Sequence, residues 1–344
     1  MRKTCRVQVN GAEFFAERGE VLLEAALANG IEIAQGCEDG GCGACRVRLL
    51  EGLVYGGEGP EPGAIHACRS RIVSDLKVAV EQMPRVSSIS GRVLAVAPLS
   101  PDVVEVEIEP SRPLPYLPGQ CVQVQFRGYP ARYYSPTFPL QGDGDGVSIC
   151  LHVRRIPDGR VSGALGADIA AGHRVQLRGP FGAAYLRAGL ANRLVLVAGS
   201  TGFAPIWSIA EAALGENPNR RIFLVVGART LQGLYMVPAL CRLARFPNVV
   251  IVPVTDARQT VTPAVQAGPV TDYVPKLSAH DIIHAAGAPP MVAAVARMAE
   301  AAGALCFAES FLPQAEPEET WLSRTLTRLR GGERTLAVEE QSLA

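Results

Sequence analysis

The 344-residue sequence predicts a multidomain protein made of a small mixed α+β domain, an antiparallel β-barrel and a parallel α/β sheet, in that order. The length exceeds what one compact core usually holds. From residue 91 to 186, short strands alternate apolar and polar residues, which is typical of an antiparallel sheet. From residue 193, continuously apolar strands alternate with helical segments, which is typical of a buried parallel sheet.

The first domain contains a hairpin, one helix and two further strands around a glycine- and cysteine-rich loop. Asn10-Gly11 is a strong turn signal between two short strands. Apolar residues recur at helical spacing after Val21, and Gly30 ends that helix. The predicted elements are strands 4–10 and 13–16, helix 21–29, loop 36–45, and strands 46–50 and 76–80.

The second domain is predicted to be a small antiparallel barrel or sandwich. Residues 82–90 form a predicted linker to it, and residues 163–171 are its predicted helix. Its predicted strands cover residues 103–108, 122–126, 147–153 and 174–177.

The third domain is predicted to be a β-α-β arrangement. Residues 194–197 form an apolar strand that leads through a glycine turn into a helix. After Phe311 the chain is polar, and apolar residues around Trp321 suggest one amphipathic helix. The remaining predicted elements are helix 206–214, strands 222–226, 249–254 and 282–285, and helix 291–302.

These changes of pattern place the domains at residues 1–84, 85–188 and 189–313, with a tail at 314–344. Lys plus Arg and Asp plus Glu both number 33, so the composition does not suggest nucleic-acid binding. The first ten residues lack the apolar core of a signal peptide, and no run of about 18 uncharged apolar residues occurs. We therefore expect a cytoplasmic protein that binds neither nucleic acid nor membrane.

Four of the nine cysteines, Cys37, Cys42, Cys45 and Cys68, have the ligand spacing of a plant-type [2Fe–2S] cluster. Glycines between them permit positive φ values and let backbone N–H groups approach the sulfur atoms. A structural zinc site is the alternative, but zinc usually uses paired C-x2-C units and the sequence has one. The spacing therefore favours the iron–sulfur cluster.

The run Cys-Glu-Asp-Gly-Gly-Cys-Gly-Ala-Cys that ends at Cys45 resembles the ferredoxin domain of plant type and of oxygenase reductases. The residues around Cys68 resemble the fourth-ligand region of that family. This resemblance implies a β-grasp fold and a [2Fe–2S] cluster held by the four cysteines.

The second domain contains the segments Arg132-Tyr133-Tyr134-Ser135 and Gly159-Arg160-Val161-Ser162. They resemble the flavin domain of the ferredoxin–NADP reductase superfamily, where R-x-Y-S/T is followed by G-x-x-S. The resemblance implies an FAD site, with FAD favoured over FMN. Arg132 can contact the pyrophosphate, Tyr134 offers an aromatic face to the isoalloxazine ring, and Ser135 can hydrogen-bond flavin N5.

The same resemblance assigns further cofactor contacts. His152 and Val153 are expected to contact the flavin through the backbone of their strand. Gly159, Val161 and Ser162 open a helix, where amide N–H groups and a hydroxyl suit phosphate oxygens.

Three segments of the third domain resemble the nucleotide-binding elements of the same superfamily. The turn Gly199-Ser200-Thr201-Gly202 follows a strand and opens a helix, as a phosphate-binding turn requires. Arg229 and Tyr235 fall in the element where the adenosine ribose usually lies. The last segment resembles the turn beside the nicotinamide, and its expected contacts are Gly287, Pro289 and Met291.

Two departures from the superfamily pattern stand out. Ala286 takes the place of a cysteine beside the nicotinamide, so we expect slower hydride transfer or a looser ring pose without loss of activity. Gly233 stands where many relatives have Asp, so the sequence does not identify a residue that selects NADH over NADPH. NADH is favoured because oxygenase-type relatives commonly use it, and NADPH remains possible.

The resemblance also implies a hydride-transfer site made of Ser135, Thr201 and Glu309, with Phe311 covering the flavin face that the nicotinamide must displace. Many relatives end near that aromatic residue, whereas this chain continues to Ala344. Phe311 is therefore either this cover or an ordinary core residue.

The domain order predicts an NADH-dependent oxidoreductase that passes electrons from NAD(P)H to FAD, then to the [2Fe–2S] cluster and an external acceptor. This order resembles reductase components of Rieske dioxygenases and di-iron monooxygenases, whose acceptor is an oxygenase component or a separate electron-carrier protein. It also resembles the reductase of radical deoxysugar dehydration. The same three domains could also serve as a stand-alone flavin reductase, or as a non-catalytic redox sensor or electron-transfer scaffold.

Overall fold

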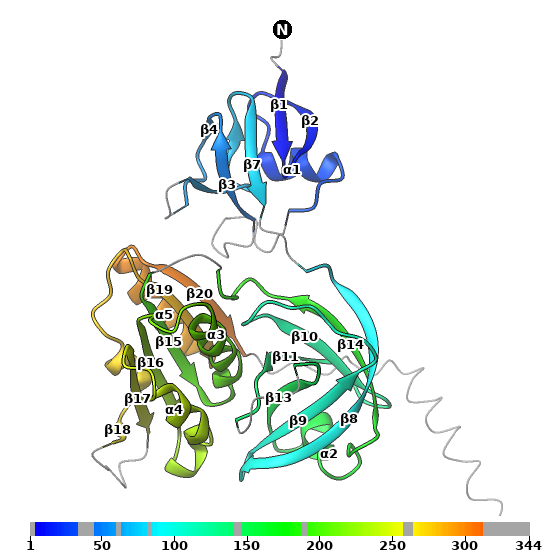
Figure 1. The fold of residues 1–344 in the computed structure, drawn as a ribbon, viewed down its shortest axis with the longest axis vertical. Coiled ribbons are helices and arrows are strands. Elements are labelled where there is room, and N and C mark those ends of the chain that lie inside the picture. The colour runs from blue at the N-terminus through cyan, green and yellow to red at the C-terminus, as the bar shows by residue number, and fades with distance from the viewer. Residues whose placement is uncertain are drawn as a thin grey trace, which may run out of the picture. The chain divides into compact units, whose positions relative to one another are not determined.

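The computed structural model describes residues 4–33, 45–59, 63–80, 84–140, 146–187, 192–256 and 264–311. Its strands form sheets of five, seven and six strands and one two-stranded ribbon, which confirms the predicted fold class (Figure 1). None of the helices within these residues is long and apolar enough to cross a bilayer. The predicted tail helix around Trp321 lies outside the described residues.

The first sheet is mixed and has the order β2-β1-β7-β3-β5. Its first two strands form the predicted antiparallel hairpin, and β7 then pairs in parallel with β1. The helix α1 buries Leu22, Leu23, Ala25 and Ala26. The element bounds are β1 Thr4–Val9, β2 Ala12–Glu17, α1 Leu22–Ala28, β3 Arg46–Glu51, β5 Ala64–His66 and β7 Leu76–Val80, with β4 Val54–Tyr55 and β6 Arg71–Ile72 in the ribbon.

The second sheet has seven strands in the order β11-β10-β14-β8-β9-β13-β12 and encloses its own apolar core. Alternating residues of each strand face this core, such as Val104, Val106 and Ile108 of one strand. The element bounds are β8 Ser87–Ser100, β9 Val103–Pro110, β10 Cys121–Phe126, β11 Arg132–Tyr134, β12 Pro136–Thr137, β13 Ile149–Arg154, α2 Arg160–Ala164 and β14 Arg174–Phe181.

Two predictions for this domain are wrong. The strand β8 begins at Ser87, inside the predicted linker 82–90, and pairs with both β9 and β14. Gly91 and Pro98 hide it in the sequence because both residues usually interrupt strands. The helix covers residues 160–164 in place of 163–171, because the chain is already extended at Leu165 and Gly166 has a φ of 83°.

The third sheet is parallel, in the order β18-β17-β16-β15-β19-β20. The chain moves outward from β15 in one direction and then returns to place β19 on its other side, so these two strands form a topological switch point. The element bounds are β15 Leu194–Gly199, η1 Ser200–Gly202, α3 Phe203–Glu216, β16 Ile222–Ala228, η2 Leu231–Gly233, α4 Val237–Leu243, β17 Val249–Thr255, β18 Gln266–Ala267, η3 Val270–Tyr273, β19 Ile282–Gly287, α5 Pro289–Ala301 and β20 Leu305–Ser310.

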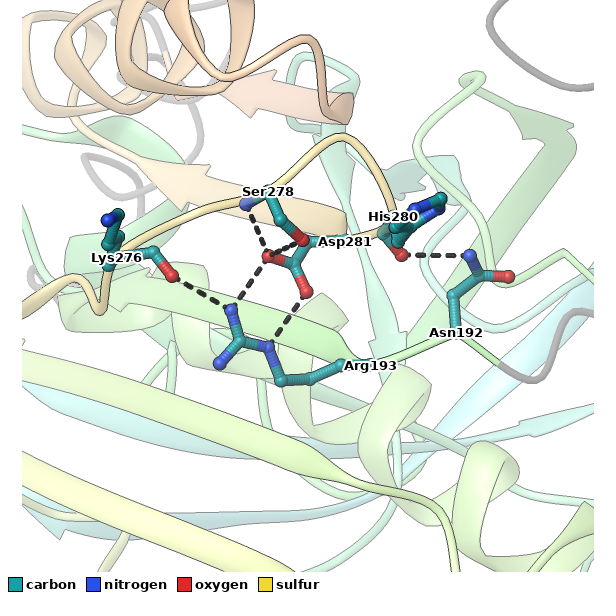
Figure 2. Close-up of polar contacts among 6 residues, drawn as sticks. All are labelled: Asn192, Arg193, Lys276, Ser278, His280 and Asp281. Atoms are coloured by element: carbon teal, nitrogen blue, oxygen red, sulfur yellow. Dashed lines mark hydrogen bonds and ion pairs between the residues drawn. The ribbon is translucent and has the colours of Figure 1, made fainter.

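A polar cluster ties together the amino ends of β15 and β19, as Figure 2 shows. Arg193 donates from Nε and Nη2 to the two carboxylate oxygens of Asp281 at 2.8 and 2.7 Å. The Ser278 amide and hydroxyl also donate to Asp281, at 2.7 and 3.0 Å. Arg193 further donates to the carbonyl of Lys276 at 3.0 Å. Because Asp281 is only 4% exposed, this bidentate pair should stabilise the sheet more than a surface pair would.

Replacing Asp281 with Asn is expected to lower the free energy of unfolding by about 2 kcal/mol, because Arg193 loses its buried anionic partner. Burial alone would raise the pKa of Asp281, but hydrogen bonds from Arg193 and Ser278 outweigh it and hold that pKa below the ordinary value of 3.8. The stabilisation is therefore complete above that value and is lost as the pH falls through the depressed pKa. The difference between wild type and variant should accordingly shrink in strong acid.

Unfolding can be followed by the fluorescence of Trp207, which is fully buried in the same domain, in a Trp321→Phe background. A matched control is Glu109→Gln in the barrel, which breaks the exposed Arg92–Glu109 pair of 2.8 Å. That control should change the unfolding free energy by less than about 0.5 kcal/mol. Equal effects of the two variants would contradict a stabilising role for the Arg193–Asp281 pair.

Candidate functional site

Two glycine turns meet at the carboxyl ends of β15 and β19. The Arg193–Asp281 pair lies at the other, amino ends of the same two strands. Gly202 lies so close to the Ala286 carbonyl group that a Cβ atom there would overlap it. A Cβ atom at Gly287, where φ is 145°, would lie 3.1 Å from the Gly199 carbonyl oxygen. The two turns therefore pack backbone against backbone at the switch point, where open α/β sheets bind their ligands.

In the turn after β15, Ser200 stands where the superfamily motif has a glycine. Ser200 has a φ of 51°, a left-handed conformation that glycine adopts without strain. Thr201 follows it in the single 3₁₀ turn η1, half-buried, and Gly202 precedes α3. The long helix α3 therefore begins directly at the turn, with its first amide groups near the strand end.

The second turn is held by side chains of the helix that follows it. Pro289 occupies the first helical position of α5, where the absent N–H group costs no hydrogen bond. The sulfur atom of Met291 would lie 3.1 Å from a Cβ atom at Gly199, so this side chain covers the end of β15. The Phe311 amide donates to the Gly287 carbonyl at 2.8 Å, which brings the end of β20 to the same turn.

A buried carboxyl group lies where β20 reaches the barrel. Glu309 interacts with the hydroxyl of Ser135, the residue after β11, and with the thiol of Cys121, the first residue of β10. Burial raises the pKa of Glu309 to about 7, although its interactions with the Cys121 thiol and the Ser135 hydroxyl act in the opposite direction. Burial, with the nearby Glu309, also raises the pKa of Cys121 to about 12, so this thiol keeps its proton.

The Ser135–Glu309 pair fits a flavin ring that brings its own hydrogen-bonding atoms. Ser135 is 5% exposed, and Ser135 Oγ and Glu309 Oε2 are both buried without a well-formed hydrogen bond. Buried polar atoms are rarely left so, and such a pair indicates a partner that binds between the barrel and β20. A flavin nitrogen is a suitable partner for a hydroxyl of this kind.

The strand that precedes Ser135 carries the predicted flavin contacts. Arg132 and Tyr134 are half-buried, and Tyr134 packs against the barrel core. Burial raises the pKa of Tyr134 to about 12, with Arg132 acting against the rise. Tyr133 is 45% exposed and makes an edge contact with Phe181, so it faces away from that core. The flavin contacts of Arg132 and Tyr134 stay predictions.

Contacts within the predicted phosphate-binding segment 159–162 and with the preceding Ile156 hold its backbone in place. Gly159 is the residue before α2, and a Cβ atom there would overlap the Ser162 hydroxyl. That hydroxyl oxygen accepts from the Ile156 amide at 3.1 Å, while its O–H group can still donate. Val161 packs in the barrel core, so only its backbone could contact a phosphate. The phosphate contacts remain predictions.

The predicted contacts His152 and Tyr235 lie together between the barrel and the third sheet. Tyr235 Oη is 3.2 Å from His152 Nδ1, and both residues are buried. The Tyr235 hydroxyl thus has a hydrogen-bond partner in His152, and its contact with the ribose stays a prediction. Val153 faces the barrel core, which leaves its backbone for the flavin. Arg229 is 71% exposed and lies 4.0 Å from Asp102.

Two of the four predicted cluster ligands lie within the described residues. Cys45 precedes β3 and is buried, and Cys68 follows β5. Their sulfur atoms are 3.1 Å apart, and the Ala67 amide donates to the Cys45 carbonyl at 3.0 Å. Two sulfur atoms at this separation fit ligands that converge on one cluster. Cys37 and Cys42 lie outside the described residues.

Cys121 is the site residue that the sequence did not predict. The available signal was the alternation along β10, which places Cys121 on the face opposite Val122 and the barrel core. The sequence could not show that this face meets Glu309, which comes much later in the chain. A thiol therefore lies beside Glu309 although Ala286 lacks one.

Three known protein families match this chain, and each match covers most of one of the three sheets. The 2Fe-2S iron-sulfur cluster binding domain matches residues 4–73, the oxidoreductase FAD-binding domain matches residues 92–185, and the oxidoreductase NAD-binding domain matches residues 196–297. The predicted cofactor types, a [2Fe–2S] cluster, FAD and NAD, are thereby confirmed.

Several curated proteins are similar over nearly their full length. The naphthalene 1,2-dioxygenase system ferredoxin–NAD(P)(+) reductase component of Pseudomonas putida is 30% identical, over 89% of this chain and 98% of that protein. A naphthalene 1,2-dioxygenase/salicylate 5-hydroxylase systems reductase component of a Ralstonia species is 31% identical, over 87% and 95%. The CDP-6-deoxy-L-threo-D-glycero-4-hexulose-3-dehydrase reductase of Yersinia pestis is 27% identical, over 86% and 93%.

Among solved structures, an Amycolatopsis cytochrome P450 reductase is 30% identical with a TM-score of 0.61, covering 90% of this chain and 99% of that one. A ferredoxin reductase in carbazole 1,9a-dioxygenase shares the fold, with 24% identity and a TM-score of 0.60 over 91% and 99%. The chain belongs to the ferredoxin–NAD(P)+ reductase components, oxidoreductases that join a [2Fe–2S] domain to FAD-binding and NAD-binding domains.

Proposed function

We propose that this chain is the reductase component of an oxygenase system in the cytoplasm, where it oxidises NADH and delivers single electrons to an oxygenase or to a separate electron-carrier protein. The observation that carries the proposal is the convergence of the Ser135–Glu309 pair with two glycine turns at the sheet switch point. The names of the Pseudomonas and Ralstonia relatives, both parts of dioxygenase systems, support the acceptor class.

In this reaction NADH supplies a hydride, and bound FAD and the [2Fe–2S] cluster convert it into single electrons. The chain contributes binding, orientation and proton handling. The backbone of the turns at Gly199–Gly202 and Gly287 would orient the nucleotide, and Phe311 is tied to the second turn by its amide. Ser135 would hold the flavin edge, and Glu309, with a pKa raised to about 7 by burial, can accept or release a proton near neutral pH.

The pairing of Arg229 is compatible with NADH. This side chain follows β16, where the adenosine ribose is predicted to lie, and an arginine there could bind the 2′-phosphate of NADPH. Its guanidinium group lies 4.0 Å from Asp102, which also lies 3.5 Å from Arg154, so the carboxylate offsets part of the positive charge that a 2′-phosphate would need.

The proposal is tested with the purified protein carrying both cofactors. Under anaerobic conditions NADH should bleach the flavin and cluster absorbance faster than NADPH, and a rhombic paramagnetic signal of the reduced cluster should appear. The reduced protein should then reduce a Rieske-type ferredoxin or oxygenase. A protein that neither nucleotide bleaches would favour a role as redox sensor or scaffold.

The acceptor is tested separately, because the Yersinia relative belongs to a deoxysugar dehydrase system. Electron delivery to a Rieske-type ferredoxin and to a dehydrase of the deoxysugar type is compared at equal reductase concentration. Faster reduction of the dehydrase would replace the oxygenase assignment. Flavin reduction without delivery to any protein acceptor would indicate a stand-alone flavin reductase.

A pH dependence follows from Glu309. Because burial raises its pKa to about 7, the rate of flavin reduction by NADH should change with an apparent pKa near that value. Glu309→Gln should remove this step from the pH profile and lower the rate by roughly a hundredfold or more. Glu300→Gln in α5 is the control, since that residue is exposed, and it should keep the wild-type profile. An unchanged profile in Glu309→Gln would exclude Glu309 as the titrating group.

A further inference from the structure

A buried polar chain joins the barrel to the third sheet through Tyr235, His152 and Glu105. Tyr235 lies between η2 and α4, and its Oη atom is 3.2 Å from His152 Nδ1 on β13. The other ring nitrogen, His152 Nε2, is 3.7 Å from Glu105 Oε2 on the neighbouring strand β9. His152 and Glu105 are direct partners in the register of these two strands, so the backbone itself aligns the pair.

Burial determines which atoms of the chain carry protons. Tyr235 and His152 are 6% and 5% exposed. Burial raises the pKa of Tyr235 and lowers the pKa of His152, although Glu105 acts against the second shift, so the phenol is protonated and the imidazole is neutral. A neutral imidazole has one N–H group. If Tyr235 donates to Nδ1, the proton lies on Nε2 and points toward Glu105.

Glu105 is ionised and can therefore accept a hydrogen bond from the N–H group of His152. Burial alone would raise its pKa, but interactions with His152, the Cys150 thiol and the Leu140 amide outweigh it and lower the pKa. Glu105 Oε2 and His152 Nε2 are buried, face each other at 3.7 Å and have no well-formed hydrogen bond within the described residues. The Tyr235 O–H and the His152 N–H groups can therefore both point in one direction, from Tyr235 toward Glu105.

The two ends of the chain belong to the two cofactor-binding halves. On the barrel side, His152 precedes Val153 on the strand whose backbone is predicted to contact the flavin. On the other side, Tyr235 ends the segment that carries Arg229, and its ring makes an edge contact with Phe203, the first residue of α3. Because α3 begins at the Gly202 turn, this contact joins two nucleotide-binding elements. Tyr235 belongs to the element that follows β16, and Phe203 belongs to the element that follows β15.

We propose that Tyr235 and His152 are positioning residues whose hydrogen bond holds the nucleotide-binding segment 228–236 and the start of α3 in register with the flavin side of the barrel. The inference rests on the proposed hydride transfer from NADH to FAD. Neither side chain has to contact the nicotinamide. A hydride donor and acceptor must be held at close to reacting distance, and small displacements of bound groups reduce rates strongly.

The test uses the protein loaded with both cofactors and compares Tyr235→Phe with Tyr273→Phe. Tyr273 lies in the same domain, and its hydroxyl donates to the Ala267 carbonyl at 2.8 Å near the protein surface. Tyr235→Phe is expected to lower the limiting rate of flavin reduction roughly tenfold and to change the apparent affinity for NADH by less than about threefold. Tyr273→Phe should leave both quantities at the wild-type values.

A second readout needs neither nucleotide nor turnover. Amide hydrogen exchange of segment 228–236 should become at least about tenfold faster in Tyr235→Phe, because the segment loses its hydrogen bond to His152 on β13. Tyr273→Phe should not change it. If wild-type protein is not reduced by NADH or NADPH, the proposed function fails, whereas this exchange contrast still tests the positioning role.

Two substitutions at His152 test the direction of the chain. The Oδ1 atom of His152→Asn can take the place of Nδ1 and accept from Tyr235, while His152→Gln places its amide near the former Nε2 and leaves Tyr235 unpaired. Reduction should therefore be at least roughly fivefold slower in His152→Gln than in His152→Asn. Equal rates in the two variants, or equal behaviour of Tyr235→Phe and Tyr273→Phe, would overturn the proposal.

Metal analysis completes the test. Ligand atoms of Glu105, Cys150 and His152 lie within 4.8 Å of one another, a set that could instead bind zinc. The hydrogen-bonded arrangement of Tyr235, His152 and Glu105 predicts no bound zinc at this place and unchanged metal content in Cys150→Ser. One equivalent of zinc that is lost in Cys150→Ser would overturn the proposed direction, because an imidazole bound to zinc through Nε2 carries its proton on Nδ1 and would donate to Tyr235.

Discussion

Replacing Cys68 with Ser is expected to remove the [2Fe–2S] cluster while leaving the flavin reducible by NADH. The Cys68 and Cys45 sulfur atoms lie 3.1 Å apart, and a serine oxygen is a poor substitute for a thiolate ligand of iron. Electron delivery to a one-electron protein acceptor should fall by about a hundredfold or more, because the route through the cluster is lost. Iron content, the visible spectrum and acceptor reduction are measured on the same sample.

Cys241→Ser is the matched control for this prediction. Cys241 is an exposed cysteine on α4 and lies outside the predicted ligand set. The control should keep the iron content and the acceptor activity of the wild type. If Cys68→Ser retained the full iron content, Cys68 would not be a cluster ligand. Loss of flavin reduction along with iron would instead indicate that the first domain supports the folding of the others.

Replacing Gly202 with Ala is expected to disable the nucleotide site and to destabilise the third domain. A Cβ atom there would overlap the Ala286 carbonyl and approach the Gly287 nitrogen to 2.8 Å, and neither backbone group can rotate away. The two turns must separate, with an expected overpacking cost of about 1–3 kcal/mol. A displacement of this kind should lower flavin reduction by NADH roughly a hundredfold.

Gly215→Ala, in the helix that follows Gly202, provides a control of opposite sign. Gly215 lies near the end of α3, and a Cβ atom there would meet no atom within 4 Å. Alanine should therefore stabilise the helix by about 0.5–1 kcal/mol and leave flavin reduction unchanged. Thermal unfolding and stopped-flow flavin reduction distinguish the two variants. Similar stability of Gly202→Ala and wild type would contradict the close backbone contact.

The extent to which the sequence predicts this structure depends on whether the signal is local. The hairpin at Asn10-Gly11 and the strand–turn–helix unit at Gly199 are predictable because each is determined by neighbouring residues. The strand β8 is missed because Gly91 and Pro98 lower its local propensity. Pairing with β9 and β14 on its two sides compensates, and such pairing cannot be read from the residues themselves.

The candidate site shows the same division. Short motifs predict Ser135, Gly202 and Glu309, and these motifs determine the backbone around each residue. The contact of Cys121 with Glu309, and that of Tyr235 with His152, join segments from different sheets. They depend on how two separately predictable units pack against each other. Side-chain chemistry alone therefore identifies the parts of the site but not the connections between them.

The position of Glu309 on β20, the edge strand of the third sheet, has a consequence during protein synthesis. A ribosome that has translated the first 300 codons has already produced every barrel strand and both glycine turns. The carboxyl group that completes the pair with Ser135 has not yet been made. A nascent chain at this stage holds the flavin and nucleotide motifs without Glu309, so we expect it to oxidise NADH more slowly than a chain that includes β20.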